Sequence, residues 1–317
     1  MKRAVLLAIP IILGAAAASA AVDPALLDLM PPDAAVLFGL QVQSVLASPF
    51  GQYAVAQLPT NNGMVQFAAA TGFDYQHDLI EMLGATPAPN GTRPRPSLVL
   101  ARGNFQVSKF LALAAVTGST LTYYNGTQII SPPNNKSSLA FLNASTLAIG
   151  SPAALQAAID RYGTQSLSQP SRNSTSPLGL KAIAASSTSD AWFATVAPAS
   201  QFANPAAPAS PATLLQSVVE ASGGVHFGST GGATFASELT TPSAQQAQSL
   251  VAILQLVAAM AAQSNTAAGP AQAAALLSGA QFTVNGTALD ISVPVPEQQL
   301  EQMYSSRPRP ANKAAVQ

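Results

Sequence analysis

The sequence predicts an α+β fold built as a tandem pair of related modules, each a mostly antiparallel sheet with helices packed on one face. Residues 97–163 carry the clearest pattern, because strand-like runs and two segments of helical period follow one another there. Landmarks then recur in the second half of the chain. Asp33 and Asp190, each before a strand-like run, lie 157 residues apart, and the Asn-Gly turns at Asn125 and Asn285 lie 160 apart. A near-constant offset is typical of an internal duplication, and coincidence of common turns is the alternative.

The composition indicates a folded chain with an almost uncharged polar surface. The chain has 317 residues, enough for two ordinary domains, and only 8% of them are charged. Basic and acidic residues number 13 each, with no basic stripe, so nucleic-acid binding has no electrostatic basis. Because there is no cysteine, disulfides, thiol chemistry and lipoprotein anchoring are excluded.

Residues 1–20 have the pattern of a secretory signal peptide. Lys2 and Arg3 precede an apolar run over 5–13, and Ala18-Ser19-Ala20 provides a cleavage site. An uncleaved membrane anchor is the alternative, but the apolar run is short. We therefore expect an exported protein, periplasmic or extracellular, with no transmembrane span after cleavage. Export without disulfides fits a bacterial envelope best.

The expected domain organisation follows from composition. A Ser/Gln/Pro-rich stretch without apolar periodicity separates the two modules and is the expected linker. The boundaries are 1–20 for the signal peptide, 21–166 for the first module, 167–177 for the linker, 178–306 for the second module and 307–317 for a flexible tail.

In the first module, a buried-type strand over 35–42 precedes helical patterns over 44–58 and 65–70. Asp74 can cap a helix over 75–83, which Gly84 would end. A Pro-rich loop leads to residues 98–163. There we expect a strand over 98–101, a helix over 107–116, hairpins pairing 121–124 with 128–130 and 139–142 with 146–149, and a helix that starts at Pro152 and ends just before Gly163.

In the second module, short helices are expected at 178–185 and 213–220. Thr241 and Pro242 open a long helix to about residue 263, and Pro296 opens a final amphipathic one. The expected strands cover 191–196, 225–228, 233–239, 282–284 and 289–293.

The densest group of polar residues is Asp74, His77, Asp78 and Glu81. On a helix, residues four apart share a face, so two or three of these side chains could reach one divalent metal ion. The alternative is a capped first helical turn with His77 in solvent, which we favour because a metal site normally needs a ligand from another segment.

Other chemical motifs are absent or incomplete. There is no G-x-S-x-G or S-x-x-K pattern for a serine nucleophile. The glycine-rich stretch 228–232 lacks the lysine and following helix of a phosphate loop, so a turn between strands fits better. Trp192 fits a core position better than an exposed platform. The Ala-rich run 250–262 fits a buried or partner-binding helix better than a membrane span.

Nine short segments carry a resemblance to a known family. They are residues 32–34, 48–51, 71–74, 78–79, 100–105, 124–127, 140–142, 148–150 and 158–160. On these segments the chain resembles an uncharacterised family of secreted bacterial α+β proteins with repeated strand–helix modules. The likeness covers residues 30–165 and continues more weakly to 305. It implies a scaffold, and no activity, cofactor or catalytic residue to carry over.

The sequence therefore favours a non-catalytic exported protein that binds a partner or ligand in the cell envelope. No catalytic, cofactor-binding or metal-binding residue is assigned, and no cofactor is expected. The alternative is a hydrolase or metal-dependent enzyme that uses Asp74, His77, Asp78 and Glu81. Self-association through a sheet edge or the Ala-rich helix is a third possibility.

Overall fold

The structure is a computed structural model that describes residues 21–58, 62–88, 97–133, 137–164, 172–202, 215–263 and 279–305. The expected signal peptide and the tail over 307–317 lie outside these residues, as does 167–171 of the expected linker. Those three expectations therefore stay predictions.

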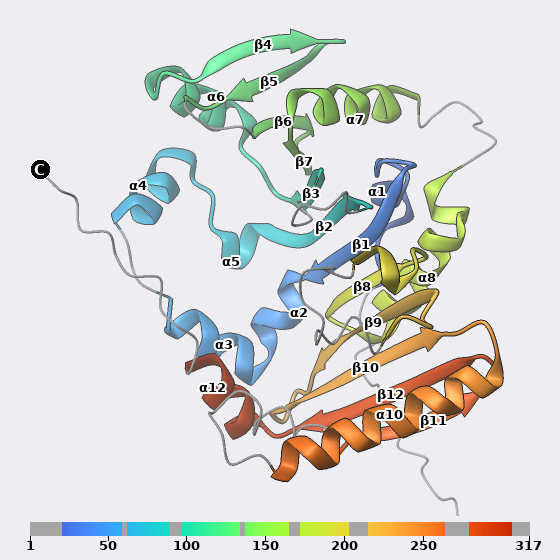
Figure 1. Ribbon diagram of the computed structural model, residues 1–317. Helices are drawn as coiled ribbons and strands as arrows, with labels where there is room; N and C mark the ends of the chain where they lie inside the picture. Colours follow the sequence, from blue (N-terminus) through green and yellow to red (C-terminus); the bar gives the residue numbers. More distant parts are fainter. Residues whose placement is uncertain are drawn as a thin grey trace, which may run out of the picture.

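The strands in this part of the chain form one antiparallel sheet in the order β11-β12-β10-β9-β8-β1-β2-β3-β7-β6-β5-β4 (Figure 1). The expected α+β class with an antiparallel sheet is confirmed. The strands are β1 (Ala34–Gln41), β2 (Leu79–Pro87), β3 (Leu98–Gly103), β4 (Thr120–Tyr124), β5 (Thr127–Ser131), β6 (Ser138–Asn143), β7 (Thr146–Gly150), β8 (Ala191–Thr195), β9 (Glu220–Phe227), β10 (Ala233–Thr240), β11 (Gln281–Asn285) and β12 (Ala288–Val295).

The two halves of the chain meet where β1 pairs with β8. The register places Leu37 opposite Ala194 and Phe38 opposite Phe193. The first half thus supplies β1 to β7 on one side of this pair, and the second half supplies β8 to β12 on the other. The division into two related modules, and the duplication behind it, stay predictions, because one continuous sheet is compatible with either history.

Helices lie on both faces of the sheet, and the expectation that they cover one face is wrong. Successive residues of one strand lie in different cores: Leu100 packs in the core that contains residues of α7 and α8, whereas Ala101 packs with residues of α6. Side chains alternate across a strand, so two adjacent buried residues require cover on both sides. We name the two sides the α8 face and the α10 face.

The helices are α1 (Pro24–Leu27), α2 (Val42–Ala47), α3 (Pro49–Ala56), α4 (Asn62–Thr71), α5 (Tyr75–Asp78), α6 (Val107–Val116), α7 (Pro152–Thr164), α8 (Pro177–Thr188), α10 (Ala244–Gln263) and α12 (Glu297–Ser305), with short 3-10 turns η1 (Asn173–Thr175) and η2 (Ala199–Phe202).

On the α8 face, residues 22–30 form a segment that we name the N-terminal strap. Its side chains pack in one core with residues of α7 and α8, from the two halves of the chain. Backbone groups of the strap are also bonded on both sides, since Arg161 Nε donates to Leu29 O (2.8 Å) and Val22 N donates to Ser186 Oγ (3.0 Å). The strap therefore ties the two halves together. Its apolar side chains that are at most 3% exposed are Val22, Leu26, Leu27, Leu29 and Met30.

The helix expected over 75–83 is wrong beyond Asp78. The chain is helical only over Tyr75–Asp78 and then continues as β2. Leu83, expected in the helix, lies opposite Gly39 of β1 and Leu100 of β3. In this central strand Leu83 is completely buried. The free energy gained by strand pairing and burial outweighs the local preference for a helix.

Two other helical expectations also change. The pattern over 44–58 divides into α2 and α3, because Pro49 cannot continue the first helix and Ser48 caps the second through Gly51 N (3.0 Å). Glu220, expected to end a helix, opens strand β9 instead.

Both Asn-Gly hairpins are confirmed. β4 and β5 turn at Asn125 (φ 44°) and Gly126 (φ 78°), and β11 and β12 turn at Asn285 and Gly286 (φ 63°). These backbone angles are those for which Asn and Gly are preferred.

Candidate functional site

Asp74, His77 and Asp78 form a capped helical turn at the surface. The side chains of His77 and Asp74 are 81% and 51% exposed, and His77 Nδ1 lies 2.6 Å from Asp74 Oδ2. The bond from His77 holds the pKa of Asp74 below its usual value. Asp74 Oδ1 accepts from Gln76 N (2.9 Å), and Asp78 Oδ2 accepts from Asp74 N (2.7 Å). These contacts satisfy the backbone donors at the start of α5.

Glu81 does not join this group. It lies on β2, is 1% exposed, accepts from Gln41 Nε2 (3.0 Å) and has Oε2 2.9 Å from Arg102 Nη2. Burial raises the pKa of Glu81, although Arg102 acts in the opposite direction. The structure thus separates Glu81 from Asp74, since the chain changes from helix to strand between them. Across the described residues, no group of three His, Cys, Asp or Glu side chains could hold a metal ion.

His226, the second histidine, pairs with a buried carboxylate. Its Nδ1 lies 3.0 Å from Asp190 Oδ2, which also accepts from Phe227 N (2.8 Å). Asp190 in this way fixes the end of β9. In the part of the chain described, neither His226 nor His77 shares a hydrogen bond with a serine or threonine hydroxyl, so no serine dyad forms there.

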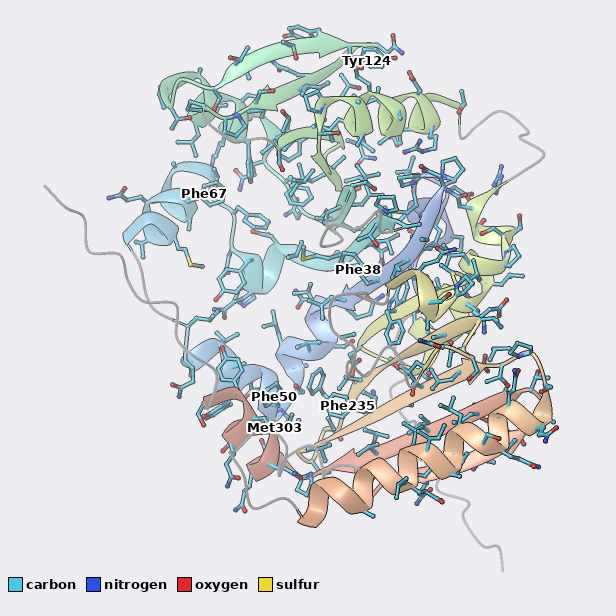
Figure 2. The ribbon with its side chains drawn as sticks, viewed as in Figure 1. Phe38, Phe50, Phe67, Tyr124, Phe235 and Met303 are labelled. Carbon is cyan, nitrogen blue, oxygen red and sulfur yellow. The ribbon has the colours of Figure 1, made fainter. Side chains whose placement is uncertain are left out.

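The first of two hollows in the second half lies on the α10 face, and we name it the apolar hollow. Its volume is about 400 Å³, and its floor spans β8, β9, β10 and β12 without a charged side chain. Phe193 is 37% exposed there. Figure 2 shows Phe38 and Phe235 on the strands to either side of β8 and β9. The lining residues are Ala191, Trp192, Phe193, Gly224, Val225, Phe235, Ala236, Ser237, Ile291 and Val293.

The strand register explains why the apolar hollow exists. One row across the sheet reads Ala191, Val225, Phe235 and Val293. In the next row, Gly223 and Ser237 stand between Phe193 and Ile291. Two small residues between two large ones leave a depression that no side chain of the row can fill.

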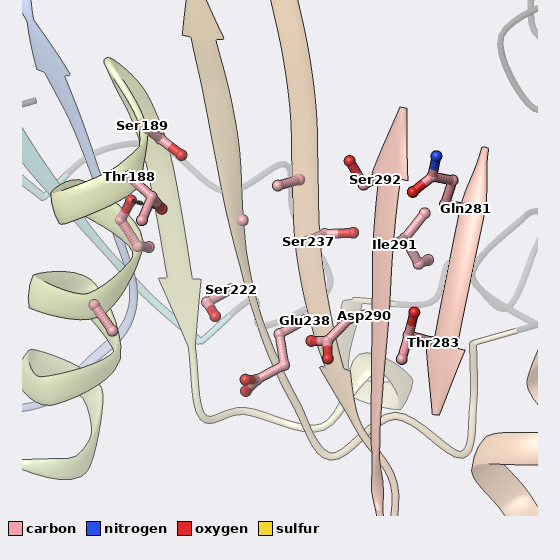
Figure 3. Close-up of a pocket in the computed structure, with 14 residues that line it drawn as sticks. Thr188, Ser189, Ser222, Ser237, Glu238, Gln281, Thr283, Asp290, Ile291 and Ser292 are labelled. Carbon is pink, nitrogen blue, oxygen red and sulfur yellow. Dashed lines mark hydrogen bonds between the residues drawn. The ribbon is translucent and has the colours of Figure 1, made fainter. Parts of the chain in front are cut away.

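The second hollow lies on the opposite face, between α8 and strands β9 to β12, and we name it the polar pocket (Figure 3). Its volume is about 310 Å³. Figure 3 shows Glu238 and Asp290 on neighbouring strands, on the side toward α8. The lining residues are Ala184, Ala185, Thr188, Ser189, Ser222, Gly223, Ala236, Ser237, Glu238, Gln281, Thr283, Asp290, Ile291 and Ser292.

The carboxylates of the polar pocket have few cationic partners. Lys181 Nζ from α8 lies 2.8 Å from Glu238 Oε1 and 3.3 Å from Glu220 Oε2. Partial burial lowers the pKa of Lys181, but the two carboxylates together raise it more. Asp290 Oδ2 accepts from Asn285 Nδ2 (2.8 Å), a neutral donor. Among the described residues around the polar pocket, negative charge is therefore in excess.

Sequence reasoning identified neither hollow, although a signal for both is present. Residues 289–293 alternate strictly between apolar and polar side chains, and this pattern predicts a strand with one apolar and one polar face. The pattern does not say which parts of either face a helix will cover. That depends on where α8 and α10 lie.

Comparison with known proteins identifies structures with a similar fold. No family model matches the chain, and no curated protein matches it. The structure is similar to that of TP0453 in crystal form III, with a TM-score of 0.52 at 11% identity over 90% of this chain and 99% of that one. It is also similar to crystal form IV of TP0453, with a TM-score of 0.50 at 12% identity over 88% of this chain and 96% of that one. At such identities the likeness concerns the fold alone.

Among the helices of the described ranges, none combines the length and the apolar character needed to cross a bilayer.

Proposed function

We propose that the protein is an exported, non-catalytic binding protein of a bacterial cell envelope, and that the apolar hollow holds an apolar group of its ligand or partner. Export is inferred from the signal-peptide pattern of residues 1–20. The binding role is inferred from the apolar hollow. The two-module organisation, with the boundaries given above, is part of the same proposal.

The observation that carries the proposal is an uncovered apolar floor on an otherwise well-packed sheet. Phe193, Val225, Phe235, Ile291 and Val293 line about 400 Å³ of open space. This volume is within the ordinary range of small-ligand sites, roughly 300 to 1,000 Å³. Water in contact with such a floor is released when an apolar group covers it, and that release favours binding.

The enzyme alternative receives less support from the geometry. Asp74, His77 and Asp78 satisfy one another and their own backbone at an exposed turn, and Glu81 faces a different environment. The open hollow of about 460 Å³ beside His77 is otherwise lined by Gln, Ala, Leu and Val side chains of α2, α3 and α5. A general acid–base pair needs a second titratable group within reach of the substrate.

The test is titration of the mature chain with N-phenyl-1-naphthylamine, a neutral apolar dye whose fluorescence rises in apolar sites. We expect saturable binding and a change in the emission of Trp192, the single tryptophan, which precedes Phe193. Replacing Phe193 by Ser should weaken binding by about tenfold, the effect of losing most of one buried aromatic contact.

Two further variants make the result specific. Val293→Thr keeps the shape of a floor residue while adding a hydroxyl, so it should also weaken binding. Val116→Ser changes a side chain that is 82% exposed on α6 and should have no effect. Equal dye binding by all four proteins would contradict the proposal, as would substrate turnover that is lost on changing one defined residue. Light scattering on the same samples tests self-association.

A further inference from the structure

The polar pocket lies on the other face from the apolar hollow, and its floor is an ordered row of polar side chains. Ser222, Glu238, Asp290 and Thr283 occupy directly opposite positions on β9, β10, β12 and β11. Side chains opposite one another in an antiparallel sheet have Cβ atoms about 4.5 to 5.5 Å apart. Neighbouring members of this row on β9 to β12 are thus within reach of one small ligand, with Glu238 and Asp290 at the centre (Figure 3).

Two of these groups, Glu238 and Asp290, are carboxylates on neighbouring strands. Like charges directly opposite one another destabilise a sheet. Lys181 lies 2.8 Å from Glu238 and 3.3 Å from Glu220, so a single ammonium group serves two carboxylates on the side toward α8. Asp290 is bonded to the neutral amide of Asn285. Among the described residues, one cation thus serves two of these three carboxylates and none pairs with Asp290, so a cation beside Asp290 would relieve the repulsion.

Ser222 supplies an unpaired polar group on the floor of the polar pocket, independently of the carboxylates. It is 9% exposed, and it lines the polar pocket. Its hydroxyl has no hydrogen-bond partner among the residues that the structure describes, whereas the neighbouring Thr195 hydroxyl on β8 donates to Ala35 O (2.8 Å). The hydroxyl faces the open pocket, where a ligand atom would take the place of water as its hydrogen-bond partner.

We propose that the polar pocket binds a small organic cation through a primary ammonium group. The ammonium group donates to Glu238 and Asp290, and a second polar group of the ligand bonds to the hydroxyl at one end of the row, that of Ser222 or of Thr283. Lys181 already shows that an ammonium group suits the carboxylate of Glu238. An anionic ligand is disfavoured by the same excess of negative charge.

The test is calorimetric titration of the mature chain with 1,4-diaminobutane, beside butane-1,4-diol, which has the same carbon chain without charge. We expect saturable binding of the diamine only, with an affinity that falls as salt rises. Asp290→Asn should weaken binding by about tenfold, because a charge-assisted hydrogen bond becomes a neutral one. Ser222→Ala should weaken it less.

A matched control is available in the first half of the chain. Asp160 also accepts from the Asn of an Asn-Gly turn, since Asn125 Nδ2 donates to its Oδ1 (2.7 Å), but it is exposed and lines neither hollow. Asp160→Asn should leave diamine binding unchanged. Thermal unfolding of each variant shows whether it is folded.

Several results would overturn the inference. They are binding of the diol as tightly as the diamine, unchanged diamine binding by folded Asp290→Asn, and no diamine binding by the wild type. Binding of Ca²⁺ without binding of the diamine would also overturn it, since the pocket would then be a metal site. Because the apolar dye and the diamine bind opposite faces, failure here leaves the proposed function standing.

Discussion

The two halves of the sheet differ in how completely helices cover them. In the first half, an aromatic cluster closes the α10 face: Phe73, Phe105, Phe110 and Phe141 pack together with ring centroids 5.0 to 6.3 Å apart. In the second half, α10 packs over β11 and β12, and α12 packs near the ends of β10 and β12. Phe193, on β8, stays 37% exposed.

The α8 face shows the same contrast. The N-terminal strap and α7 bury the strands of the first half, whereas α8 leaves Glu238, Asp290 and Thr283 accessible from the polar pocket. Both candidate sites therefore lie in the second half. The candidate sites of this protein thus lie where helices cover the sheet incompletely, and not where reactive residues are dense.

The largest expected effect comes from weakening the strap that joins the halves. Leu27 is fully buried, so Leu27→Ala should lower the free energy of unfolding by roughly 4 kcal/mol, through lost burial and the cavity left behind. The measurement is urea unfolding followed by both circular dichroism and Trp192 fluorescence. Leu256→Ala, at a side chain 61% exposed on α10, should cost less than about 0.5 kcal/mol.

Unfolding of Leu27→Ala also shows whether the two halves of the sheet unfold together. If the halves unfold as one unit, both signals change at the same urea concentration in the wild type and in Leu27→Ala. Trp192 lies opposite Gly39 of β1 in the core that both halves share, so its fluorescence reports on the junction between them. A change in its fluorescence at a lower urea concentration than the change in circular dichroism would mean that the junction opens before the halves unfold.

The next largest effect concerns ion pairs. The paired carboxylate is buried in the first half of the chain and partly exposed in the second. Arg102→Met leaves the buried carboxylate of Glu81 without its cation and should cost roughly 3 kcal/mol near neutral pH. Lys181→Met, whose partner Glu238 has a side chain 45% exposed, should cost less than about 1 kcal/mol.

The sign of the pH dependence separates these variants further. Because burial raises the pKa of Glu81 in the folded state, its contribution to stability is present below the ordinary value of 4.5 and lost as pH rises through the raised pKa. Without Arg102 the pKa rises further. The loss of stability in Arg102→Met should therefore be larger at about pH 7 than at about pH 4. An equal loss at both pH values would show that Arg102 acts through packing.

The smallest effect compares two glycines. A Cβ at Gly224, in the second half, would lie 2.5 Å from Ser189 Cβ and would also meet Ala191 O. Gly224→Ala should therefore destabilise the protein by roughly 2 kcal/mol. A Cβ at Gly163 of α7 meets nothing within 4 Å, so Gly163→Ala should stabilise by about 0.5 kcal/mol through helix propensity. Melting temperatures of both variants check the two signs.

The strands and hairpins were predictable where local chemistry decides them. The Asn-Gly turns set β4–β5 and β11–β12, and Ser151 with Pro152 marks the start of α7. The prediction of a helix over 75–83 is wrong from Leu79 onward, because this segment pairs with β1 and β3, whose residues lie far away in the chain. The same failure placed Glu81 beside Asp74 in the expected site.

The α+β class, the positions of most turns and the absence of thiol chemistry follow from the amino-acid sequence alone, because side-chain period, Asn-Gly turns and composition can be read directly along the chain. The pairing of β1 with β8, the helices on both faces and the two open hollows of the second half are visible only in the folded chain. Those features depend on which distant surfaces meet, and a strand such as β12 has the same alternation of Leu289, Asp290 and Ile291 whether or not a helix covers it.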